Sequence, residues 1–187
     1  PKESIREIRI NSNPFSAEYD RLGLGRIEIL TKPGTDRFRG QASFNFNDDA
    51  LNARNPFATS RPPIQTRQYG ANFSGPISKK KASFFLDFEK RDIDDQALIV
   101  ATVLDANNNI VGFNETVPIP SRRTTLSPRI DYQINHSNTL VGRYSYARTT
   151  RATGVGGFAL PSRAYDTTGT EQNLQLTETA VINKTIV

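Results

Sequence analysis

Few side chains in this sequence have the types and spacing that catalysis or metal binding requires. His136 is the single histidine and cysteine is absent, so a metal site or a catalytic triad built on either would lack partners. Asp92, Asp94 and Asp95 are close together, but the loop of alternating ligands and glycine that binds calcium is missing. Residues 154–157 are rich in glycine, yet the lysine of a phosphate-binding loop does not follow them. We therefore expect no enzyme activity, no cofactor and no metal.

The charge of the chain is basic, but its distribution is not that of a nucleic-acid-binding protein. The net charge is +5 and the sequence pI is about 9.6. A single-strand binding platform would combine a basic groove with stacked aromatic residues. The basic residues here alternate with other types or gather in short turns, as at residues 79–81. We expect a solvated surface and no nucleic-acid partner.

Apolar residues recur at every second position in separate segments of the chain, which is the pattern of two-faced β-strands. In the clearest segment, Phe38, Phe44 and Phe46 share one face, while Arg39 and Asn45 share the other. Hardly any stretch has helical spacing, so the sequence predicts an all-β fold. The predicted strands cover residues 37–47, 68–77, 83–91, 126–135, 140–148 and 173–182.

The composition of the two faces favours a barrel that crosses a membrane. The polar faces carry Arg, Asp, Glu and Asn in mid-strand, as a hydrated lumen would, and the apolar faces carry Phe, Tyr and Leu. Each segment is near the roughly nine to eleven residues that a tilted strand needs to cross the hydrocarbon layer. We therefore predict an antiparallel transmembrane β-barrel segment of about six strands, with outer-membrane lipid as a partner.

The connections between these strands alternate between short and long, as the periplasmic turns and extracellular loops of outer-membrane barrels do. Two apolar stretches flank the turn-like residues 105–109, so residues 97–117 are predicted to form a hairpin outside the membrane. The short connections are residues 78–81 and 136–138, and the long ones are residues 48–66, 105–123 and 149–170.

The hairpin that joins residues 126–135 to residues 139–148 allows a prediction of register. Even-numbered residues must face lipid on both strands, so directly paired residues must have numbers with an even sum. The shortest loop that meets this condition is residues 136–138, with its last residue in the left-handed conformation. This loop predicts that Asp131 pairs directly with Arg143 on the polar face.

The segment before residue 37 differs from the rest. It contains two short apolar runs, at residues 5–10 and 27–30, and then Lys32-Pro33-Gly34-Thr35. Proline followed by glycine is typical of a type II turn, in which Gly34 would have a positive φ. We predict a small unit at residues 1–36, joined by this turn to barrel strands at residues 37–187, and we expect the sequence to be an excerpt of a longer chain.

Two motifs resemble a known family. The run Phe15-Ser16-Ala17-Glu18-Tyr19-Asp20-Arg21 precedes Ile27 to Gly40, which contains Thr31-Lys32-Pro33-Gly34-Thr35. In this order and spacing they resemble the plug-to-barrel junction of TonB-dependent outer-membrane receptors, especially the Oar-like group. The resemblance is strongest over residues 5–48 and extends loosely to Phe88.

The resemblance implies a domain organisation, a location and a set of partners. Residues 1–36 would be the C-terminal part of a plug domain, and residues 37–187 the first strands of a barrel of about 22 strands. The protein would lie in the cell outer membrane and take up a large nutrient, such as a peptide, a glycan or a metal chelate. An inner-membrane complex would supply energy through parts of the chain that this sequence does not contain.

Candidate ligand contacts come from the plug segment between the two apolar runs and from the long connections. They are Phe15, Glu18, Tyr19, Arg21, Arg61, Arg122, Arg123 and Phe158. A secreted β-sandwich for adhesion or carbohydrate binding is the alternative, because its sheets would also alternate in polarity. A small passive porin is less compatible, because the smallest barrels have about eight strands.

Overall fold

Strands make up most of the residues that the structure describes. The computed structural model describes residues 4–11, 26–51 and 63–181. The strands are β1 (Ile5–Asn11), β2 (Arg26–Thr31), β3 (Arg39–Asp48), β4 (Gln65–Ser78), β5 (Ala82–Asp94), β6 (Gln96–Leu104), β7 (Ile110–Pro118), β8 (Ser121–Asn135), β9 (Asn138–Thr153) and β10 (Tyr165–Ala180). Two single 3-10 turns, η2 (Asp49–Leu51) and η3 (Pro161–Arg163), accompany them. No helix within the described ranges is long and apolar enough to span a membrane.

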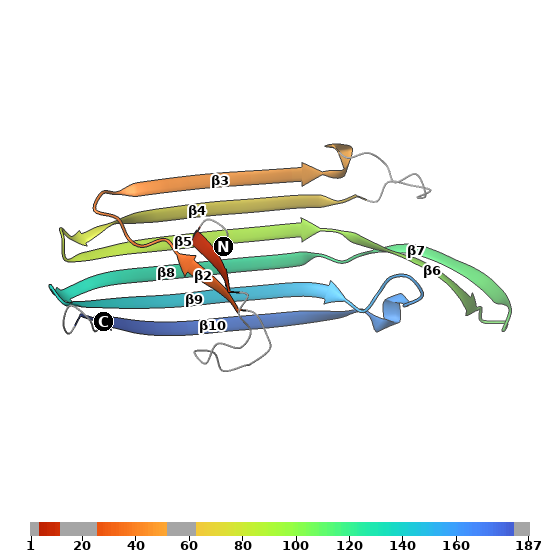
Figure 1. The fold of residues 1–187 in the computed structure, drawn as a ribbon. Helices are drawn as coiled ribbons and strands as arrows, with labels where there is room; N and C mark the ends of the chain where they lie inside the picture. Colours follow the sequence, from red (N-terminus) through yellow and green to blue (C-terminus); the bar gives the residue numbers. More distant parts are fainter. Residues whose placement is uncertain (1–3, 12–25, 52–62, 182–187) are drawn as a thin grey trace.

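Six of the strands form one antiparallel sheet in the order β10-β9-β8-β5-β4-β3. Each of the six segments predicted from the alternation contributes a strand to this sheet. Strands β1 and β2 pair separately and lie in front of the sheet in Figure 1, and we call this pair the N-terminal ribbon. Strands β6 and β7 extend beyond one end of the sheet as the predicted hairpin.

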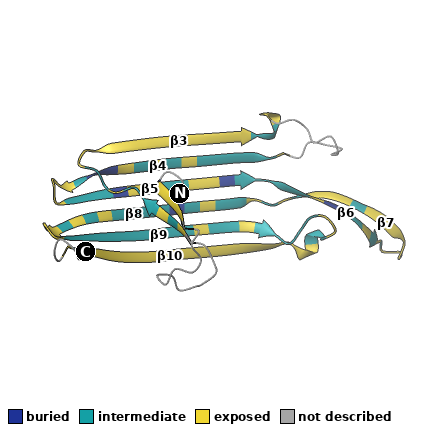
Figure 2. Ribbon diagram, viewed as in Figure 1, coloured by how far each residue is buried: buried dark blue, intermediate teal, exposed yellow. Residues whose placement is uncertain are grey.

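Cross-strand pairing gathers the apolar residues on one face of the sheet, as predicted. Phe44 pairs with Tyr69, Phe73 pairs with Leu86, and the ladder continues the same face through β8, β9 and β10. Phe44 is 58% exposed and Phe73 is 46% exposed. Figure 2 shows that exposed residues dominate β3 and β10, the two edges of the described sheet. An apolar face of this extent requires an apolar surrounding.

Five of the sheet strands, β4, β5, β8, β9 and β10, extend beyond their predicted segments at the end from which β6 and β7 emerge. Strand β8 begins before the predicted residue 126, β9 ends beyond residue 148, and β10 begins before residue 173. Polar residues replace the apolar ones there, since Lys90 pairs with Thr124 and Arg122 pairs with Thr150. The backbone pairing continues through these polar residues. The prediction missed them because it relied on the alternation of apolar and polar residues.

The pairing between β8 and β9 confirms the parity rule and corrects the predicted register. Arg129 pairs with Arg143, and Asp131 pairs with Val141, so the paired numbers have an even sum. The predicted pair of Asp131 with Arg143 is wrong by two residues. Both strands nevertheless keep their polar residues on one face.

A bulge explains the difference in register. Asn135 pairs with Asn138 across a two-residue loop, and the ladder shifts between Asn135 and Gln133. With a two-residue loop alone, the numbers of directly paired residues would have an odd sum. The extra residue Ile134 makes this sum even again along the rest of the hairpin. The predicted left-handed Asn138 is also wrong, because its φ is not positive. Instead the Asn135 side chain accepts hydrogen bonds from the backbone of Ser137 and the side chain of Asn138, both at 2.9 Å.

Candidate functional site

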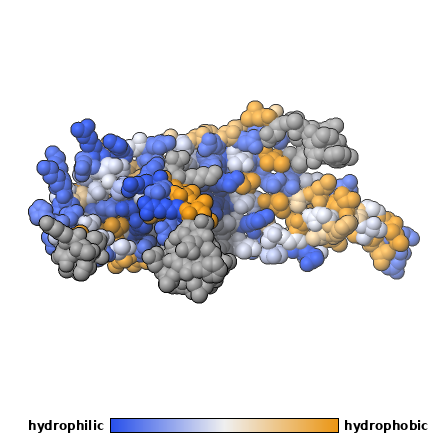
Figure 3. Space-filling view, in the orientation of Figure 1, coloured by the Kyte–Doolittle hydropathy of each residue, from blue (hydrophilic) through white to orange (hydrophobic). Residues whose placement is uncertain are grey.

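A cleft separates the N-terminal ribbon from the polar face of the sheet. It has a volume of about 510 Å³. The ribbon contributes Ser4, Ile5, Ile29 and Thr31, and the sheet contributes Phe85, Ser127, Pro128, Arg129, Arg143, Tyr144, Ser145, Asn173 and Gln175. Figure 3 shows that this face is mostly hydrophilic, with apolar atoms over the ribbon. The ribbon therefore covers the middle of the face that the sequence assigns to a lumen.

An ion pair on β8 attaches the segment after the ribbon to the sheet. Arg129 and Asp131 lie two residues apart, with Nη2 of the arginine 2.6 Å from Oδ1 of the aspartate, and their side chains are 12% and 17% exposed. Nη1 of Arg129 donates to the carbonyl of Thr31 at 2.9 Å and to its Oγ1 at 3.0 Å. Oδ2 of Asp131 accepts the backbone N–H of Gly34 at 3.0 Å. We call this set of contacts the Arg129–Asp131 latch.

The latch replaces the Asp131–Arg143 pair that the sequence predicted. Alternation correctly places all three charged side chains on the polar face, but the bulge brings Arg143 opposite Arg129. Asp131 therefore bonds to the arginine of its own strand, through contacts at 2.6 to 3.1 Å. The sequence contains no signal that Asp131 pairs with Arg129 and not with Arg143, because both arginines have odd numbers and point to the same face.

Gly34 lies so close to the sheet that a side chain would not fit. A Cβ built on Gly34 would be 2.4 Å from Oγ of Ser83 and 2.8 Å from the backbone nitrogen of Phe84. The predicted type II turn is wrong, because the positive-φ glycines of the described chain are Gly154, Gly156 and Gly157. Glycine is needed at position 34 for close approach to β5 and not for a left-handed conformation.

Replacing Gly34 with alanine is expected to detach residues 31–34 from the sheet. The contact at 2.8 Å involves backbone, so shortening Ser83 cannot relieve it. We expect faster hydrogen exchange at residues 26–34 in the Gly34→Ala variant, measured by mass spectrometry on the full-length protein. Gly169→Ala is the matched control, because nothing lies within 4 Å of a Cβ there. Equal exchange in both variants would contradict the close approach.

A second group of charged residues lies at the end of the sheet nearest the β6–β7 hairpin. Nη2 of Arg67 is 2.6 Å from Oδ2 of Asp94. Arg122, a predicted ligand contact, pairs with Asp94 and Asp92 and donates from Nη1 to the carbonyl of Ile93 at 2.6 Å. The contacts of Arg122 are thus within the sheet.

The other predicted ligand contacts do not converge on one point. Arg123 is exposed on the polar face, opposite Arg91 and Thr149. Phe158 is 88% exposed in the connection between β9 and β10. The predicted contacts Phe15, Glu18, Tyr19, Arg21 and Arg61 lie outside the described residues.

An apolar surface at the same end was not predicted as a site. Leu98, Val100, Leu104 and Ile110 of the β6–β7 hairpin are between 50% and 77% exposed. Figure 3 shows an apolar region over β6 and β7. The run of apolar residues in β6 could have indicated such a surface, because a solvated hairpin usually alternates in polarity.

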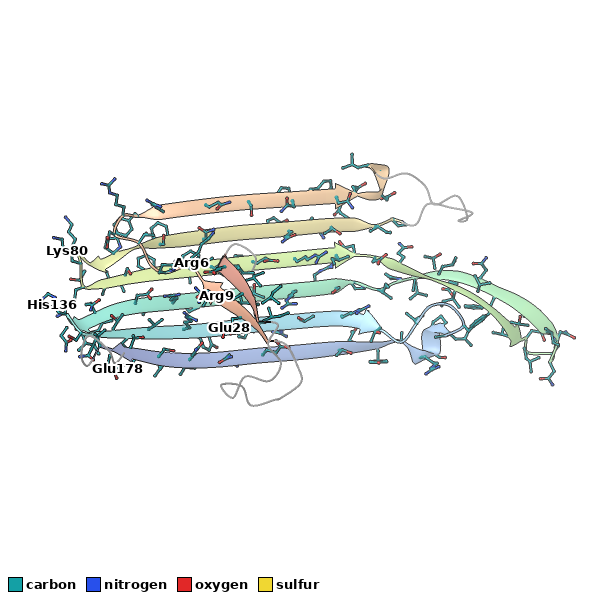
Figure 4. The ribbon with its side chains drawn as sticks, viewed as in Figure 1. Arg6, Arg9, Glu28, Lys80, His136 and Glu178 are labelled. Atoms are coloured by element: carbon teal, nitrogen blue, oxygen red, sulfur yellow. The ribbon has the colours of Figure 1, made fainter. Side chains whose placement is uncertain are left out.

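The opposite end of the sheet carries the short turns. Figure 4 shows Lys80 and His136 together there, with Glu178 nearby, and Lys80 has a φ of 59°. Glu178 lies on the apolar side of β10. Its place at the end of the strand, opposite Leu140, removes it from the middle of that face.

Comparison with known proteins gives one family match. Residues 30–125 match the family model described as outer membrane beta barrel domain. The matched range covers about half of the chain, from the end of β2 to the first part of β8. No match was found among curated proteins or among solved structures.

Proposed function

This chain belongs to the family of outer membrane β-barrel domains, and from that premise we propose that it is part of a TonB-dependent receptor of the outer membrane. Such a receptor would bind a large nutrient at the cell surface and import it with energy from an inner-membrane complex. The N-terminal ribbon would be the last part of the plug. The six-stranded sheet is then the lipid-facing wall next to it.

The observation that carries the proposal is the Arg129–Asp131 latch. A passive channel has no use for a separate ribbon fastened across its polar face, whereas a plugged receptor needs one that is held firmly but reversibly. The latch consists of hydrogen bonds to charged groups, each worth about 1.5 to 3 kcal/mol. Contacts of that strength hold the ribbon at rest and still allow a directed force to release it.

The orientation follows from the lengths of the connections. Outer-membrane barrels have short periplasmic turns and long extracellular loops. The turns at Lys80 and His136 (Figure 4) would therefore face the periplasm. The β6–β7 hairpin and Phe158 would lie at the cell surface, where a ligand arrives first.

The proposed mechanism uses the cleft beneath the ribbon. When the ribbon moves, Thr31 and Gly34 leave the latch and the cleft widens along Ser127 and Ser145. These side chains are polar, so a hydrated ligand can pass them without losing all its hydrogen bonds to water. The apolar face remains in contact with lipid throughout.

A test uses the absence of cysteine from this chain. Ser127→Cys places a thiol in the cleft beneath the ribbon, where movement of the ribbon should speed its labelling by a membrane-impermeant maleimide. In living cells we expect labelling of the full-length protein to slow severalfold when a protonophore removes the energy supply. Ser43→Cys is the control, because it lies on the polar face away from the cleft.

The two alternatives predict different results. A passive porin would be labelled at Ser127→Cys at the same rate with and without the protonophore. The secreted β-sandwich is not favoured by the family match, and it would be recovered in the soluble fraction instead of the outer membrane. Equal labelling at both sites in energised and de-energised cells would overturn the proposal.

A further inference from the structure

The β6–β7 hairpin has one occupied edge and one free edge. Strand β6 pairs with β7 on one side, and on the other side it forms a bridge from Ile99 to Gly157. The amide of Val100 donates to the carbonyl of Gly157, and the amide of Gly157 donates to the carbonyl of Leu98, each at 2.9 Å. Within the described part of the chain, the outer edge of β7 pairs with no strand.

The register identifies which backbone groups point out from that edge. At the two ends of the hairpin, Asp105 donates to Asn109 at 2.9 Å and Ile119 donates to Asp95 at 2.8 Å, so odd-numbered residues bond across the pair. Hydrogen-bonded and non-hydrogen-bonded pairs alternate in an antiparallel ladder. The even-numbered residues of β7 therefore direct their N–H and C=O groups outward. They include Gly112, Asn114 and Thr116.

The outer edge of β6 shows that the backbone N–H and C=O groups of even-numbered residues in this hairpin can pair with another strand. On β6 it is likewise the even-numbered Leu98 and Val100 that bond to Gly157. A short extended segment has thus already added to this hairpin from the other side. The free edge of β7 presents the same kind of groups over a longer stretch.

The chemistry of the hairpin selects an uncharged, apolar occupant. Glu115 is the single charged residue in β6 and β7. Leu98 and Val100 are exposed by 50% and 53% on the face that an added strand would extend. If a charged peptide bound beside this surface, its charges would lose their hydration and would meet no opposite charge.

We propose that the free edge of β7 binds an extended, uncharged peptide by adding it as a further strand of the β6–β7 sheet. In this mode the backbone supplies affinity, and side chains on alternate positions supply specificity. The proposal names a peptide as the ligand class of the receptor proposed above. Its role in uptake rests on that function, whereas the binding itself can be measured without transport.

The test measures binding to the purified full-length protein in detergent. The probe is a fluorescein-labelled peptide of alternating threonine and valine with blocked ends, and fluorescence anisotropy reports binding. Asn114→Pro removes an outward N–H without removing a bond to β6, and proline is tolerated at sheet edges. We expect it to weaken binding at least about tenfold, whereas Asn114→Ala, which keeps the N–H, should bind within about twofold of the wild type.

Further variants make the outcome decisive. Thr116→Pro and Thr116→Ala repeat the comparison at a second outward residue, in case Asn114→Pro does not fold. A probe with alternating threonine and glutamate should bind more weakly than the uncharged one. Equal binding by the proline and alanine variants, binding that prefers the charged probe, or self-association of the protein through β7 in place of peptide binding would overturn the proposal. None of these results depends on energy coupling, so they do not bear on the proposed function.

Discussion

Replacing Leu86 with arginine is expected to lower the free energy of unfolding by about 2 to 4 kcal/mol, which is the cost of an arginine facing lipid near the middle of the bilayer. Leu86 lies in the centre of the apolar face, between Phe73 on β4 and Pro128 on β8. The measurement is denaturant unfolding of the full-length protein in phospholipid vesicles. Far-UV circular dichroism is a suitable signal, because this chain contains no tryptophan.

The matched control is Ser145→Arg. Ser145 lies on the polar face two strands away, at the cleft, where water and other polar side chains surround it. An arginine there should change the free energy of unfolding by less than about 1 kcal/mol, as surface substitutions usually do. If both variants lost the same stability, the two faces would not be in different media, and the assignment of the apolar face to lipid would be wrong.

Replacing Arg129 with alanine is expected to release the N-terminal ribbon without unfolding the sheet. The variant loses two hydrogen bonds to Thr31 and the ion pair to Asp131, which keeps only the backbone N–H of Gly34 from the latch. Loss of even one such charged contact, worth about 1.5 to 3 kcal/mol, raises the population of the open state by at least about 10- to 100-fold. Hydrogen exchange at residues 26–34 should accelerate by that factor, while exchange in β4 and β5 should not change.

Gln175→Ala is the control for this prediction. Gln175 also lines the cleft, but its side chain donates to Thr177 of its own strand at 3.4 Å. Its removal should leave ribbon exchange unchanged. Unchanged exchange in Arg129→Ala as well would show that the latch does not hold the ribbon, and it would remove the main support for the proposed function.

The two faces of the sheet could be predicted because the side-chain period of a strand is a local property. Residues such as Phe44 and Asn45 point to opposite sides whatever the strand pairs with. The hairpin at residues 97–117 was predictable for a similar reason, since its two apolar stretches flank turn residues such as Asp105 and Asn109. The family match agrees with the predicted β-barrel fold class.

The register of the β8–β9 hairpin needed more than local information. Parity limited it to an even sum, but parity allows registers that differ by two residues. The choice depended on Ile134, whose extra place in the ladder compensates for a two-residue loop. A bulge of this kind has no signature in alternation, because it lies where the strand meets its turn.

The sequence by itself therefore determined the all-β class, the six sheet strands and the face on which each residue lies, because these follow from a period of two along each strand. Only the tertiary structure decided that Arg129 and not Arg143 pairs with Asp131, and that Gly34 is needed for close approach to β5. It also decided where the ribbon crosses the polar face. These features join residues almost a hundred positions apart, such as Thr31 and Arg129, and no pattern within one segment specifies which distant segment it meets.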